Sequence, residues 1–303
     1  MEFICFVELM KKIFDSFLSE KFREQTERII IGIAIGSFVL HLIVIFLVSQ
    51  KIIHVDSNLI KNPISAIYTP FSFILVYEVF LLVFYLPWSI SNYIGKQYEI
   101  ITLIVIRRIF KDIGNMELSS NWFKLQHDLQ FTYDLATSVI LFFLIQQFYL
   151  KIDNQSKKDV SENVKMSAKI NRFIQLKKII AKILIPVVIV LALYAFINWI
   201  VTNQQSHWNN LPNFKNINNI FFEDFFILLI IIDVILLLFS FFYSSSFHKI
   251  IRNSGFVIST ILIKLSFSVE GIINNALIIG AVVFGYLILL IHNSYSSRTR
   301  IDH

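Results

Sequence analysis

Ionisable side chains that stand inside apolar segments are the residues of this chain most able to do chemistry. Arg107 and Arg108 interrupt the run LIVIRRIFKDIG, and Glu78 interrupts the run FILVYEVFLLVF. Asp233 and Lys264 stand in similar apolar surroundings in the second half of the chain. Within a bilayer a charge is costly unless it is paired, and such charges often mark the path of an ion or a proton. We take these residues as candidates for charge pairs or for an ion pathway.

The spacing of Glu78 and Arg107 predicts that the two residues face each other. If the chain turns near Ile94, they lie at similar depths, because a helix rises about 1.5 Å per residue. Arg108 can take the same place if its helix is rotated, and Lys111 extends the basic face by one helical turn. The first hairpin is therefore expected to contain a charge pair of Glu78 with one of the two arginines.

A second hairpin is expected to repeat this arrangement. With a turn near Lys249, Asp233 and Lys264 also reach similar depths. Two roles fit such pairs: a layer of charge past which an ion moves, or a structural clasp between neighbouring helices. The sequence favours neither role over the other.

Other polar residues at spanning depth are weaker candidates. His41 is the most interesting of them, because histidine can change its charge near neutral pH, although a packed neutral histidine fits as well. The others commonly satisfy a neighbouring helix through hydrogen bonds. They are Gln146, Gln147, Asn198, Asn274 and Asn275.

The composition predicts that all these residues belong to an integral membrane protein. Of the 303 residues, 56% are hydrophobic and 16% are charged, whereas soluble domains average about a quarter charged residues. The mean hydropathy is +0.67. The single cysteine, Cys5, excludes an internal disulfide and a metal site built on several cysteines. The net charge of +6 lies in short loops without a base-reading motif, so we expect no nucleic-acid partner.

About eight membrane-spanning helices are expected. A helix needs about 20 apolar residues to cross a bilayer. The arginine segment, 97–114, is the uncertain span, and its alternative is an interfacial helix whose cations snorkel to the headgroups. The other expected spans are 29–49, 70–91, 133–150, 178–200, 221–243 and 255–292, the last as two spans that turn near Gly271.

The distribution of lysine and arginine predicts the orientation and supports the uncertain span. Cytoplasmic loops carry an excess of Lys and Arg, and these residues gather before residue 29 and in the linker 151–177. The two segments share a side only if an even number of spans separates them, so 97–114 is expected to cross. Both termini, with the tail 293–303, are then cytoplasmic. The richness in Ile, Phe, Lys and Asn suggests a bacterial inner (plasma) membrane.

The segment 1–28 is expected to form an amphipathic helix on the cytoplasmic surface of the membrane. In MEFICFVELMKKIFDSFL the apolar residues recur at helical spacing, and the charged residues fall on the other face. A docking helix for a partner subunit fits the same pattern. A cleaved signal peptide is not expected, because the first charge is acidic and no small-residue cleavage site follows.

Two similar four-helix units, 29–150 and 178–292, are expected on either side of the basic linker. FILVYEVFLLVF aligns with ILLIIIDVILLLF if one residue is skipped, which superposes their acidic residues. IRRIFKDIG aligns with IKLSFSVEG, which superposes Arg107 on Lys264 and Gly114 on Gly271. Both units begin and end on the same side, so the repeats are expected to be parallel and related by an axis along the membrane normal.

No catalytic motif accompanies these features. The seven histidines are scattered, and HExxH, GxSxG and a glycine-rich phosphate loop do not occur. We therefore expect neither an enzyme nor a cofactor or metal site. The leading hypothesis is an all-α multi-pass protein of the lipid bilayer, a channel or transporter that moves an ion or small solute or gates its movement. The alternative is a non-transporting membrane subunit or scaffold that recruits a cytoplasmic partner; a homo-oligomer fits either hypothesis.

Overall fold

The computed structural model describes residues 19–51, 66–113, 126–160, 168–205, 215–243 and 247–298, and within these ranges every regular element is a helix. The helices are α2 (Glu20–Ser49), α4 (Tyr68–Tyr85), α5 (Ile90–Ile113), α6 (Gln126–Val160), α7 (Ala168–Gln205), α8 (Lys215–Tyr243), α9 (Phe247–Ser266) and α10 (Ile272–Arg298). The expected all-helical class is confirmed for this part of the chain. Most of the segment expected to form the N-terminal amphipathic helix lies outside the described residues.

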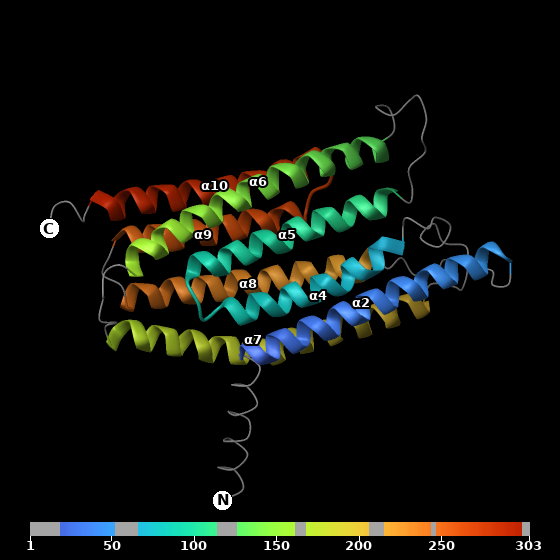
Figure 1. Cartoon of the computed structure of the whole chain (residues 1–303), viewed down its shortest axis with the longest axis horizontal. Helices are drawn as coiled ribbons and strands as arrows, with labels where there is room; N and C mark the ends of the chain where they lie inside the picture. Colours follow the sequence, from blue (N-terminus) through green and yellow to red (C-terminus); the bar gives the residue numbers. More distant parts are fainter. Residues whose placement is uncertain are drawn as a thin grey trace, which may run out of the picture.

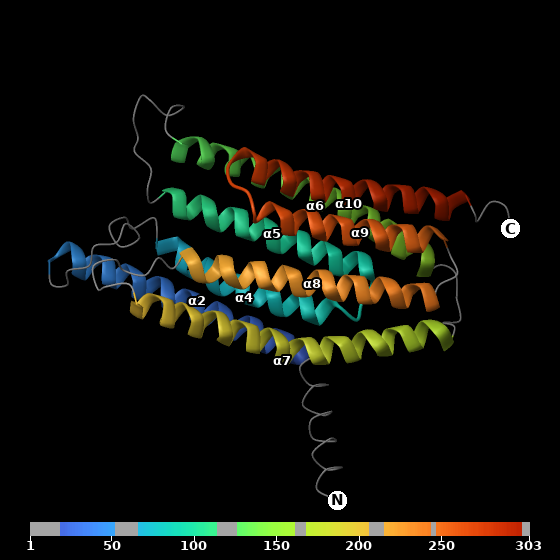
Figure 2. The ribbon, with the colours of Figure 1, turned by 180° about the vertical axis from the view of Figure 1, so that it is seen from behind.

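The helices lie side by side in one bundle and alternate in direction along the chain (Figure 1). In the first half, α2 packs on α4, α4 on α5, and α5 on α6; in the second half, α7 packs on α8, α8 on α9, and α9 on α10. The halves meet where α6 contacts α10, α5 contacts α9 and α4 contacts α7. Figure 2 shows the same helices from behind. The order of packing along the chain is therefore the same in both halves.

The exterior of the bundle is strongly apolar. The described helices long and apolar enough to cross a membrane are α2, Leu129–Asp153 of α6, Asp224–Phe242 of α8, and Ile272–Ser296 of α10. Much of this apolar surface is exposed; in α2 the buried residues are Ala34 and Ile45. Apolar surface of this extent is unfavourable in water. These helices suggest a membrane protein.

Helices α5 and α9 contribute many of the polar residues in the interior of the bundle. The inward face of α9 contains Asn253, Ser259 and Thr260. Helix α5 packs against α4, α6 and α9, and it buries Gln97 and Arg107. Most of the arginine segment, 97–114, therefore belongs to an interior helix of the bundle.

Glycine is required at two places in this packing. A Cβ atom built on Gly285 of α10 would lie 1.7 Å from the hydroxyl oxygen of Tyr98, so only glycine leaves room for this ring. Gly271 has a φ of 71°, a left-handed conformation that glycine adopts without strain. It lies between the end of α9 and the start of α10, so the turn expected near Gly271 is confirmed.

Candidate functional site

A buried carboxylate, Asp233, lies where α5, α8 and α9 meet. The residue is 5% exposed. Its Oδ2 atom accepts a hydrogen bond from Gln97 Nε2 at 3.1 Å. Thr260 Oγ1 lies 2.9 Å from the same atom and 2.7 Å from Gln97 Oε1, so its single hydrogen is shared between these two acceptors. Among the residues that the structure describes, no nitrogen of Lys, Arg or His lies within 4.0 Å of this carboxylate. Asp233 is therefore held by neutral hydrogen-bond donors.

A second hydrogen-bonded contact joins α5 to α9 beside this carboxylate. Tyr98 Oη and Ser259 Oγ lie 2.8 Å apart, and Ser259 donates to Ala281 O of α10 at 2.7 Å. Because Ser259 has one hydroxyl hydrogen, Tyr98 is the donor in the first bond. We call the four residues Gln97, Tyr98, Ser259 and Thr260 the polar seam between α5 and α9.

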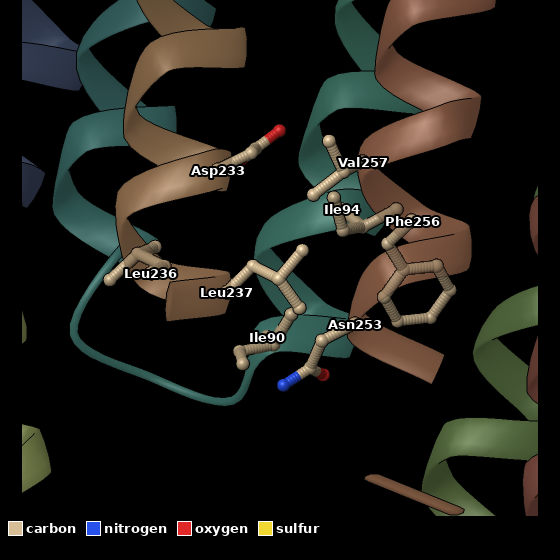
Figure 3. A pocket seen from close by; sticks show the side chains of 8 residues that line it. All are labelled: Ile90, Ile94, Asp233, Leu236, Leu237, Asn253, Phe256 and Val257. Atoms are coloured by element: carbon tan, nitrogen blue, oxygen red, sulfur yellow. The ribbon is translucent and has the colours of Figure 1, made fainter. Parts of the chain in front are cut away.

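A small cavity adjoins Asp233 between α5, α8 and α9 (Figure 3). Its polar lining consists of Asp233 and Asn253, which lie toward opposite ends, and apolar side chains such as Ile94, Leu237 and Phe256 line the rest. The cavity has about 10 Å³ of room, close to the minimum that one water molecule needs. The carboxylate thus borders a space for a single water molecule.

The second polar centre is an ion pair between Arg108 of α5 and Asp134 of α6. Arg108 donates to Asp134 through Nε at 2.5 Å and through Nη2 at 2.7 Å, a bidentate geometry. It also donates to Asn274 Oδ1 at 2.9 Å and to Asn275 Oδ1 at 2.7 Å. Asp134, which is fully buried, accepts further bonds from Gln130 and Asn275. This Arg108 cluster ties α5, α6 and α10 together.

The expected pair of Glu78 and Arg107 is not among the ion pairs of the described residues. Glu78 instead interacts electrostatically with Glu99 and Lys96 of α5, which pair with each other at 2.6 Å. The reason is the position of the turn, because α5 has already begun before Ile94. The earlier turn places Glu78 opposite the first turns of α5, whereas Arg107 lies near the far end of that helix.

Asp233 and Lys264 likewise form no ion pair within the described ranges. Lys249 already lies in α9, so the turn comes before it, and Asp233 meets Thr260. Lys264 lies in the last turn of α9, where the helix dipole favours a cation. In both hairpins the acid and the expected base therefore lie at different levels along the bundle. Arg107 itself is buried on the inner face of α5.

The weaker candidates from the sequence lie in different parts of the bundle. The two asparagines of α10 belong to the Arg108 cluster. His41 Nδ1 lies 2.6 Å from Thr69 Oγ1, so this histidine links α2 to α4. Gln146 and Gln147 lie in α6 without joining either centre, and the side chains of Lys111 and Asn198 lie outside the described residues.

Sequence reasoning missed several residues of these centres, among them Gln97, Thr260 and Asp134. Gln97 and Thr260 are neutral, so no charge inside an apolar run singles them out. Asp134 falls within the expected span 133–150. The signal that pointed to Glu78, an acid inside an apolar segment, could have found Asp134 too.

Within the described residues, no group of three or more His, Cys, Asp or Glu side chains could hold a metal ion. Comparisons of the chain with models of known families, with characterised proteins and with solved structures found no match. The functional proposal therefore rests on the two polar centres.

Proposed function

We propose that this chain is a multi-pass membrane protein that moves an ion or a small solute, or gates its movement, with Asp233 as the central ionisable group. The two halves are proposed to be parallel four-helix repeats in a bacterial inner membrane, with both termini in the cytoplasm. The shared order of helix packing supports the repeat. The excess of Lys and Arg near the N-terminus and in 151–177 supports the orientation.

The environment of Asp233 carries the proposal. A carboxylate buried in a membrane needs a counter-charge or a proton, and the described donors to Asp233 are the neutral groups of Gln97 and Thr260. A proton supplies this balance directly, and the adjoining cavity offers a place for water that delivers it. Reversible loading of a buried acid is the chemistry that a transporter or a gate needs.

The position of Asp233 between the halves connects its charge to the arrangement of the bundle. Gln97 comes from the first half, whereas Asp233 and Thr260 come from the second. Protonation of the carboxylate weakens its bond to Gln97, because hydrogen bonds to an ionised acceptor are stronger than those to a neutral one. Protonation of Asp233 thus weakens its contact with Gln97, which joins the two halves, as alternating access between repeats requires.

The test is flux across proteoliposomes, measured with pH- and ion-sensitive dyes for protons, sodium and potassium. The variants are Asp233→Asn and a matched control, Asp153→Asn, whose side chain is exposed on α6. We expect Asp233→Asn to lower the flux about tenfold or more and the control to retain it. Both variants must elute as monodisperse protein in detergent. Equal flux in Asp233→Asn and the wild type would remove Asp233 from the pathway.

The alternative, a non-transporting membrane subunit, is favoured by the Arg108 cluster. Its hydrogen bonds join three helices and leave Asp134 fully bonded, as a structural clasp would. In that case the wild type carries no flux for any ion tested. Replacing the lysines between residues 151 and 169 by glutamine, which leaves the buried Lys177 in place, would then abolish co-purification of a cytoplasmic partner, whereas a transporter would keep its flux in the same variant.

A further inference from the structure

A second, cationic pocket lies where α9 begins and α10 ends. Its polar groups are Arg252 and His248 of α9 and His292 of α10. Arg252 Nη1 lies 3.2 Å from His292 Nε2, and His292 Nδ1 lies 3.2 Å from the His248 carbonyl oxygen. A carbonyl oxygen only accepts, so His292 carries its hydrogen on Nδ1 and accepts from Arg252 through Nε2. The histidine therefore adds no charge that would balance the guanidinium.

Positive charge collects here, and within the described part of the chain no carboxylate pairs with it. Arg252 also donates to Asn253 Oδ1 at 3.1 Å, and no carboxylate oxygen of the described residues lies within 4.0 Å of its guanidinium. Lys177, just before the expected span of α7, is buried and donates to Trp88 O at 2.5 Å. Burial and the nearby Arg252 lower the pKa of Lys177 to about 8. Cations that are withdrawn from water without an anion are unfavourable, so this end of the bundle is complementary to an anion.

The surroundings of Arg252 add a helix terminus and an apolar rim. Helix α9 begins at Phe247, so Phe247 and His248 of the pocket lie in its first turn, at the positive end of the helix dipole. Phe247 is 72% exposed, Tyr295 56% and Ile291 48%. A free inorganic ion makes no favourable contact with such an apolar rim, whereas acyl chains pack on it favourably. Tyrosine at the end of an apolar helix is also typical of the membrane interface.

We propose that this pocket binds the phosphate of an anionic phospholipid, with Arg252 as its main ligand and with the acyl chains on the apolar rim. A guanidinium can hold two phosphate oxygens through parallel charge-assisted hydrogen bonds. The pocket has about 20 Å³ of room, so phosphate oxygens enter it and the rest of the headgroup stays at its mouth. Basic pockets between membrane helices bind anionic headgroups in this manner. The site does not depend on whether the chain transports anything.

The test uses the delipidated full-length protein in detergent, titrated with phosphatidylglycerol and followed by native mass spectrometry and thermal unfolding. Phosphatidylethanolamine and inorganic phosphate at equal concentration form the two comparison arms. We expect saturable binding and a rise in Tm with phosphatidylglycerol alone. Arg252→Gln should weaken this binding about tenfold or more, and Arg172→Gln, which removes an exposed arginine of α7, should leave it unchanged.

Three results would overturn the proposal. An equal rise in Tm with inorganic phosphate would make this a phosphate site and not a lipid site. Equal affinity of Arg252→Gln and Arg172→Gln for phosphatidylglycerol would place the lipid elsewhere. A third experiment uses the wild-type protein and a photoactivatable phosphatidylglycerol, so it does not depend on the folding of any variant. The cross-links should map to 247–252 or 288–295. Cross-links confined to other segments would refute the site.

Discussion

Replacing Asp134 by asparagine tests how much the Arg108 cluster stabilises the bundle. The substitution keeps the shape of the side chain but removes its charge and one of the two oxygens that Arg108 contacts through Nε and Nη2. Changing one partner of a buried ion pair costs about 3–5 kcal/mol. The Arg108 side chain is 27% exposed, so water solvates part of the stranded charge. We therefore expect the lower end of this range, about 3 kcal/mol.

The assay is thermal unfolding of the purified protein in detergent, followed by monodisperse elution after heating. Because the entropy of unfolding is about 2.1 cal/mol/K per residue, 1 kcal/mol shifts the Tm of this 303-residue chain by about 1.6 °C, and Asp134→Asn should lose about 5 °C. Asp153→Asn, exposed on the same helix, should stay within about 1 °C of the wild type. If Asp134→Asn has the same Tm as Asp153→Asn, the cluster does not stabilise the bundle.

Two further predictions concern packing and charge elsewhere in the bundle. Gly285→Ala puts a methyl group onto the Tyr98 hydroxyl and should lower the free energy of unfolding by about 1–3 kcal/mol. Gly280→Ala meets nothing within 4 Å and gains helix propensity, so it should melt at or slightly above the wild-type Tm. Equal melting of both variants would contradict this packing. Between pH 8 and 10.5 the unfolded chain keeps a proton on Lys177 that the folded chain has released, so wild-type stability should rise with pH over this window. Lys177→Met should flatten that rise in melting curves, and an unchanged slope would contradict the burial of a charged ammonium.

The helical class and one turn could be predicted, because each follows from local chemistry. The apolar composition requires helices, and Gly271 supplies the left-handed residue of the turn before α10. The start of α5 could not be predicted, because its polar residues SNYIGKQYE suggest the end of a span. In the bundle they are satisfied by neighbours: Lys96 pairs with Glu99 at 2.6 Å, and Tyr149 of α6 donates to Glu99 at 2.6 Å. Tertiary contacts thus decided where the hairpin turns.

The polar centres could be predicted only from their charged members. Arg108 and Asp233 are conspicuous because they interrupt apolar runs, but hairpin spacing relates only neighbouring helices. The partners come from distant parts of the chain: Gln97 and Asp233 are 136 residues apart, and Arg108 and Asn275 are 167 residues apart. Such contacts depend on how the two halves dock, which a single sequence does not encode in any local pattern.

The ring of Tyr98 has a mechanical consequence. It fills a hollow that Gly285 leaves in α10, and its hydroxyl is fixed by Ser259 of α9. A rigid ring seated in this way resists sliding of α5 along α9 and α10, because a shift would drive the ring into the backbone of α10. Tyr98 therefore fixes the register of one half of the chain against the other.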